Sequence, residues 1–104
     1  MSEYRIDAVV IEDDAVYQLT ELTHVIGLGP HYLDELIDCE LLAIERLPDG
    51  TYRCTSQTFT QARRAARLAR DFELGPEGLA LAVRLLYRIE ELQGKLARLP
   101  RSHA

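Results

Sequence analysis

The amino-acid sequence predicts a mainly helical fold, in which a winged helix-turn-helix precedes a helix and a long C-terminal helix with a coiled-coil end. Three observations carry this prediction. Two short helical patterns flank a glycine-containing turn at 27–29, a Pro-Asp-Gly turn at 48–50 separates two β-rich runs, and an apolar seam with a period of 3.5 residues ends at Leu99. The length of 104 residues and the 47% hydrophobic content suit one globular domain.

This single domain, residues 1–104, is expected to contain four consecutive parts. The four parts are an N-terminal extension at 1–18, the winged helix-turn-helix at 19–55, a helix at 58–73 and the long helix at 76–99. Within the extension, polar and apolar residues of 4–11 (YRIDAVVI) alternate at first and then give way to a short apolar run, as in a strand. We interpret the acidic run 12–14 as a solvated turn that ends this strand.

The helix-turn-helix is predicted between residues 19 and 42. Leu22 and Ile26 give the first helix an apolar face, and the glycines of 27–29 form the turn. Pro30 suits the first turn of the next helix, whose apolar face includes Leu33 and Leu36.

A small β-hairpin is predicted next, because Leu47-Pro48-Asp49-Gly50 lies between the β-rich runs Leu42–Arg46 and Thr51–Thr55. Proline presets φ, and glycine accepts the positive φ that tight turns need. A hairpin directly after a helix-turn-helix is a wing.

The helix that follows, residues 58–72, is rich in alanine and arginine, and Thr58 is its predicted N-cap. Its inner face is predicted to contain Phe59, Ala62, Ala65, Ala66, Ala69 and Phe72. Its outer face contains Arg63, Arg64, Arg67 and Arg70, for which we consider phosphate binding, pairing with the acidic first half of the chain, or simple solvation.

The long helix carries an a/d seam at Ala82, Leu85, Ile89, Leu92, Leu96 and Leu99. Its first half is apolar almost all round, whereas its second half is flanked by charges, so we expect the first half to pack on the body and the second half to pair with a second copy. The predicted dimer interface is Leu85, Ile89, Leu92, Leu96 and Leu99. The alternative is a helix that lies wholly on its own core.

Charge and residue types narrow the function. Residues 1–57 hold three basic against twelve acidic residues, and residues 58–104 hold nine against five. The acidic half suits a basic partner or the chain's own basic half. We recognise no catalytic constellation, metal-ligand set or cofactor motif, and Cys39 and Cys54 are interpreted as small buried or half-buried thiols. With neither a signal pattern nor an apolar run of roughly 20 residues, we expect a cytoplasmic protein without a membrane span.

Several stretches resemble a known family: Leu19–Leu22 (LTEL) with Gly27-Leu28, Arg64–Phe72 (RAARLARDF), and Gly78–Leu86 (GLALAVRLL) with Ile89 and Leu92. The order of elements is that of MerR-type winged-helix regulators, and the chain more closely resembles the CbpM family of chaperone modulators, a MerR-related group. The resemblance covers about Leu19 to Leu99, and its second half is the more specific part. The N-terminal extension is longer than we expect of this family.

The resemblance implies a non-catalytic protein that binds the J-domain of CbpA, a DnaJ-like co-chaperone, and restrains its stimulation of the Hsp70 partner DnaK. The expected homodimer rests on the a/d seam of the long helix. Because the J-domain surface that meets Hsp70 is typically basic in that family, a competitor for it should present carboxylates. The predicted partner-binding residues are Tyr32, Asp34, Glu35, Asp38 and Glu40. These acids could instead solvate the helix or pair with Arg63, Arg64 and Arg67.

The alternative function is a MerR-like DNA-binding transcriptional regulator. In such proteins the second helix enters the major groove, but the corresponding segment here, PHYLDELIDCE, has four carboxylates and neither lysine nor arginine. Carboxylates are repelled by phosphates, so we do not expect specific duplex binding. Any DNA binding would depend on Arg46 and Arg53 of the wing and on the arginine face of 58–72.

Overall fold

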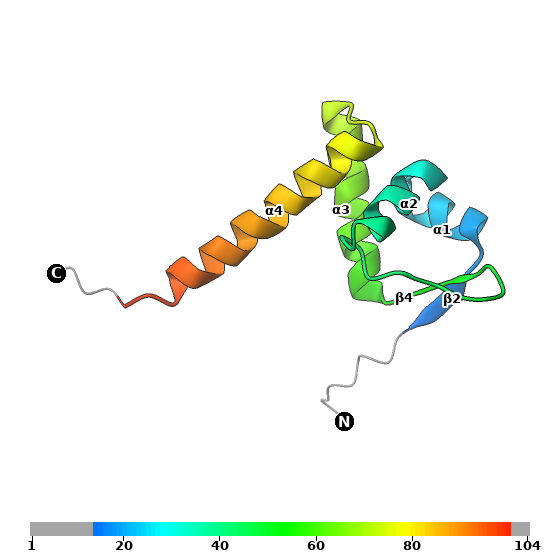
Figure 1. Ribbon diagram of the computed structural model, residues 1–104, viewed down its shortest axis with the longest axis horizontal. Helices are drawn as coiled ribbons and strands as arrows, with labels where there is room; N and C mark the ends of the chain where they lie inside the picture. The colour runs from blue at the N-terminus through cyan, green and yellow to red at the C-terminus, as the bar shows by residue number, and fades with distance from the viewer. Residues whose placement is uncertain (1–13, 101–104) are drawn as a thin grey trace, which may run out of the picture.

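The computed structural model describes residues 14–100, and it shows a small body of three helices and a sheet from which a fourth helix projects (Figure 1). The predicted strand at 4–11 lies outside the described residues. Along the chain the elements are β2 (Ala15–Tyr17), α1 (Leu19–Ile26), α2 (Pro30–Asp38), β3 (Glu45–Arg46), β4 (Tyr52–Cys54), α3 (Ser56–Phe72) and α4 (Pro76–Ala97). The mainly helical fold class predicted from the sequence, with a small β-hairpin wing after the helix-turn-helix, is confirmed.

Helices α1 and α2 form the predicted helix-turn-helix. Helix α1 ends at Gly27, whose φ of 84° is the left-handed conformation that glycine adopts without strain. Helix α2 begins with Pro30 at its first turn. Leu22, Leu33 and Leu36 are almost completely buried between the helices, so the apolar pattern of the sequence forms the core.

The wing is a three-stranded antiparallel sheet in the order β2-β4-β3. The hairpin between β3 and β4 turns at 47–50, where Gly50 has a φ of 88° and Asp49 accepts hydrogen bonds from the backbone and hydroxyl of Thr51. Both hairpin strands are shorter than the predicted runs, and β2 pairs with β4 as a third strand. The hydrogen bonds to Asp49 lower the pKa of its carboxyl, the side-chain bond from Thr51 being the larger cause.

Helix α3 begins two residues earlier than predicted. Its N-cap is Thr55, whose hydroxyl accepts a hydrogen bond from the backbone N–H of Thr58, and Thr58 itself is buried. Ala62, Ala65, Ala66 and Ala69 are buried as expected. The prediction that Phe72 belongs to the inner face is wrong, because this side chain is 68% exposed at the last helical residue.

Helix α4 packs on the body at its N-terminal half, where Leu79, Ala80 and Val83 are buried. Two tyrosine hydroxyls on helices donate hydrogen bonds to loop carbonyls. Tyr87 of α4 donates to the Leu41 carbonyl after α2 at 2.9 Å, and Tyr32 of α2 donates to the Leu74 carbonyl before α4 at 2.6 Å. The C-terminal half of α4 extends away from the body (Figure 1). Within residues 14–100, no helix has the combined length and apolar character that a bilayer crossing requires.

Candidate partner-binding site

The outer face of α2 carries the predicted carboxylates. Leu33 and Leu36 point into the core, which leaves Asp34 and Asp38, four residues apart, on one exposed face. Glu35 lies beside them and is half-buried. Its carboxylate accepts a contact from the Cys39 thiol at 3.6 Å. The amphipathic pattern of the helix thus places these three acids together.

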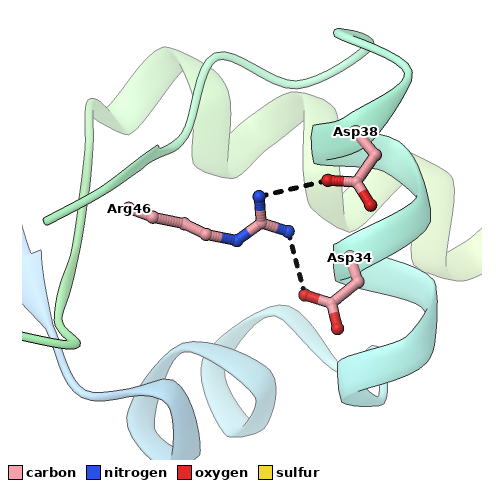
Figure 2. Close-up of polar contacts among 3 residues, drawn as sticks. All are labelled: Asp34, Asp38 and Arg46. Atoms are coloured by element: carbon pink, nitrogen blue, oxygen red, sulfur yellow. Dashed lines mark hydrogen bonds and ion pairs between the residues drawn. The ribbon is translucent and has the colours of Figure 1, made fainter.

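Arg46, the last residue of β3, reaches from the wing to this face (Figure 2). Its Nη2 lies 3.0 Å from Asp34 Oδ1, and its Nη1 lies 3.1 Å from Asp38 Oδ1. The hydrogen bonds to Asp34 and then Asp38 raise the pKa of the guanidinium above its ordinary value. One wing cation therefore bridges two carboxylates on successive turns of α2.

An open cleft of about 560 Å³ lies between α2 and the start of α4. It is lined by His31, Asp34, Glu35 and Asp38 from α2 and by Gly75, Pro76, Glu77 and Gly78. Glu77 was missed by the sequence prediction, because its closeness to α2 depends on how α4 packs. Among residues 14–100, no three His, Cys, Asp or Glu side chains are grouped as a metal ion would need. The acidic lining instead suits the side chains of a basic protein.

The remaining two predicted site residues occupy different positions. Tyr32 is half-buried, and its hydroxyl is committed to the Leu74 carbonyl, so the part of the ring that a partner could touch is limited. Glu40 is exposed beyond the end of α2 with a left-handed φ of 59°. The structure therefore brings Asp34, Glu35 and Asp38 together at one cleft. Tyr32 lies outside that cleft, in a separate hollow against α3, and Glu40 lies beyond the end of α2.

The arginines of α3 do not neutralise this acidic face. The expected alternative of pairing between the α2 acids and Arg63, Arg64 or Arg67 is wrong, because Asp34 and Asp38 pair with Arg46. Arg64 instead contacts Glu90 of α4 at 2.8 Å. Within residues 14–100, no ion pair involves Arg63, Arg67 or Arg70.

A second surface lies on the outward side of α4, opposite its buried face. We call it the α4 stripe, and it consists of Leu81, Leu85, Ile89, Leu92, Leu96 and Leu99, which are 42–66% exposed. The first half of α4 packs on the body through one face, as expected, while Leu81 and Leu85 on its outward side remain 58% and 54% exposed. One flank of the stripe carries Glu91, which contacts Arg88 at 2.9 Å and Lys95 at 3.6 Å.

A helix-turn-helix followed by a hairpin wing, with two more helices after it, defines a winged helix-turn-helix regulator of the MerR type. Residues 17–101 match the family described as MerR HTH family regulatory protein, and the chain belongs to this family.

Relatives within the curated proteins carry a more specific name. The chain is 27% identical over 101 residues to proteins named Chaperone modulatory protein CbpM from Coxiella burnetii strains Dugway 5J108-111 and RSA 331 / Henzerling II. The similarity covers 97% of this chain and 95% of each relative. No solved structure matches the chain significantly. The resemblance to CbpM seen in the sequence is confirmed, and the names of these relatives describe modulation of a chaperone.

Proposed function

We propose that this protein is a non-catalytic modulator that binds the J-domain of a CbpA-type, DnaJ-like co-chaperone in the cytoplasm. Binding would restrain the stimulation of the Hsp70 partner by that co-chaperone. The observation that carries the proposal is the acidic face of α2 in a chain similar to CbpM over nearly its full length. In this fold, α2 occupies the place of the helix that reads DNA, but the charged side chains that it exposes are carboxylates.

The chemistry of the proposed contact is the attraction between a basic J-domain surface and the α2 carboxylates. Asp34, Glu35 and Asp38, together with Glu77 across the cleft, supply the negative charge. Tyr32 and Glu40 are proposed as contacts at the edge of this face. Exposed charges of this kind speed association and set specificity more than they add affinity, and salt screens them.

The alternative function is DNA binding by a MerR-type regulator. Fewer arginine side chains are available to contact phosphates than the sequence suggested, because several of them are already in ion pairs. Both wing arginines are paired, Arg46 with Asp34 and Asp38 and Arg53 with Glu45 at 2.8 Å. Arg64 is paired with Glu90. A duplex that met α2 would also face its carboxylates, so we expect no sequence-selective DNA binding.

We also propose that two copies pair along the α4 stripe to form a homodimer, with each chain folding as one domain. Five large apolar side chains on one face of α4, with Leu99 just beyond the end of the helix, make a continuous seam, and water-exposed seams of this kind are buried when helices associate. The dimer contacts are Leu85, Ile89, Leu92, Leu96 and Leu99, with Leu81 extending the seam toward the body.

Isothermal titration calorimetry with the purified J-domain tests the proposed function. We expect saturable binding that weakens steeply as the salt concentration rises. Fluorescence anisotropy with a pool of random DNA duplexes at low salt serves as the comparison. Tight, sequence-selective binding to DNA together with no heat from the J-domain would favour the alternative regulator.

A further inference from the structure

Arg46 already occupies the part of the acidic face that a cationic partner would use. Its guanidinium is a planar fork, and its two terminal nitrogens contact one oxygen each of Asp34 and Asp38 (Figure 2). This contact brings one positive charge between two carboxylates. Arg46 therefore lowers the net negative charge that a partner cation meets at Asp34 and Asp38 by one unit.

The contact is weak enough to be exchanged. The side chains of Arg46, Asp34 and Asp38 are 43%, 52% and 65% exposed, and ion pairs in such positions contribute roughly 0–1 kcal/mol. The two aspartates also keep their positions without Arg46, because α2 is fixed by Leu33 and Leu36 in the core. Loss of the arginine would thus leave the acidic face in place and more negative.

The same sheet holds a matched arginine whose ion-pair partner is not on α2. Arg53 on β4 contacts Glu45 on β3 at 2.8 Å, and its side chain is also 43% exposed. Arg46 and Arg53 are equal in charge and similar in exposure, but they differ in which carboxylates they engage. An effect specific to Arg46 can therefore be separated from a general change in net charge.

We propose that Arg46 is a built-in competitor for the cationic side chains of the partner, so that a basic protein must displace the wing arginine from Asp34 and Asp38. This inference rests on the proposed function of the α2 face and names the residue that sets its affinity. The wing then limits how tightly the acidic face holds any cation. A partner with several basic groups displaces Arg46, while an isolated lysine or arginine competes with it poorly.

The test compares full-length Arg46→Gln, Arg46→Lys and Arg53→Gln with the unmodified protein. Each is titrated with the J-domain by calorimetry and, separately, with a fluorescein-labelled peptide of alternating arginine and serine by anisotropy. We expect Arg46→Gln to tighten both interactions by roughly three- to tenfold, a range set by the loss of two exposed ion pairs. Arg46→Lys should tighten them less, because an ammonium group lacks the planar fork that spans both carboxylates.

Arg53→Gln is the control, and it should change either affinity by less than Arg46→Gln does. Equal affinities for Arg46→Gln and the unmodified protein, or weaker binding by Arg46→Gln with its circular dichroism unchanged, would overturn the role of Arg46. If Arg46→Gln does not fold, the Arg46→Lys comparison decides between the same outcomes. Absence of J-domain binding by the unmodified protein would instead count against the proposed function, and the peptide titrations would still test the competition.

Discussion

The acidic face of α2 and the α4 stripe are both exposed, but they differ in how favourably water solvates their side chains. Asp34, Glu35 and Asp38 are charged, and two of them already share an internal cation. The α4 stripe consists of leucine and isoleucine side chains that are up to 66% exposed and gain nothing from contact with water. The charged face can remain exposed to water without loss of free energy, whereas the apolar stripe favours burial in a stable interface.

This difference indicates two kinds of interface in one small protein. A solvated acidic face suits a partner that binds and leaves, with an affinity that salt and a competing arginine can adjust. A continuous apolar seam suits a lasting contact between two copies. Substitutions on each surface test whether α2 forms the transient contact and the α4 stripe the lasting one.

The largest effect is expected when charges enter the α4 stripe. The double substitution Leu92→Asp and Leu96→Asp should convert the protein to a monomer. In the proposed dimer both leucines are buried, and removing a buried leucine side chain costs about 2–5 kcal/mol, to which burying an aspartate adds. Light scattering at high micromolar concentration measures the mass. The control adds the same charge beside the stripe, with Gln93→Asp and Ala97→Asp, and should stay dimeric. A monomeric unmodified protein would show that the stripe does not join two copies.

The second prediction compares the loss of a leucine side chain from the core of one chain with the loss of one from the α4 stripe. Leu36 is completely buried, so Leu36→Ala should lower the free energy of unfolding by about 2–5 kcal/mol at every protein concentration. Leu92→Ala should matter only where copies associate, because dimer formation stabilises the folded state by mass action. Urea unfolding at low and high protein concentration distinguishes the two. A concentration-independent loss for Leu92→Ala would place Leu92 in the core of a single chain.

A smaller effect is expected at Tyr87, which joins α4 to the body. Tyr87→Phe removes the hydrogen bond to the Leu41 carbonyl and should cost about 0.5–1.5 kcal/mol near neutral pH. Burial raises the pKa of the Tyr87 hydroxyl above its ordinary value of about 10, so the folded state holds this proton more tightly than the unfolded chain does. The stabilisation is complete below about pH 10 and is lost as pH rises through the raised pKa.

Thermal unfolding between pH 7 and 11 therefore tests the Tyr87 contact. The difference in stability between the unmodified protein and Tyr87→Phe should shrink at the alkaline end. A difference that stays constant, or grows, would show that the hydroxyl does not bind its proton more tightly in the folded state.

Much of the fold could be predicted from local patterns. The turn at Gly27, the proline starts of α2 and α4 and the Pro-Asp-Gly hairpin each depend on the backbone preferences of the residues themselves. The errors occur at helix ends and on faces set by tertiary packing. Thr55 and not Thr58 caps α3, and Phe72 is exposed because the chain turns away at Glu73.

The acidic face could be predicted as a set of residues on one helix, but its surroundings could not. Spacing alone places Asp34 and Asp38 together, because residues four apart share a helix face. Their contact with Arg46 depends on the angle at which the wing folds back, and the approach of Glu77 depends on the packing of α4. Neither is encoded in a local pattern.

The most direct test of the central claim reverses charge on α2 and measures J-domain affinity by calorimetry. Glu35→Lys with Asp38→Lys changes the acidic face, and Asp71→Lys with Glu73→Lys makes the same charge change at the exposed end of α3. With the fold checked by circular dichroism, we expect the α2 pair to weaken binding more than tenfold, or about 1.4 kcal/mol, and the α3 pair to weaken it far less. Equal affinities for the α2 variant and the unmodified protein would contradict a J-domain site on α2.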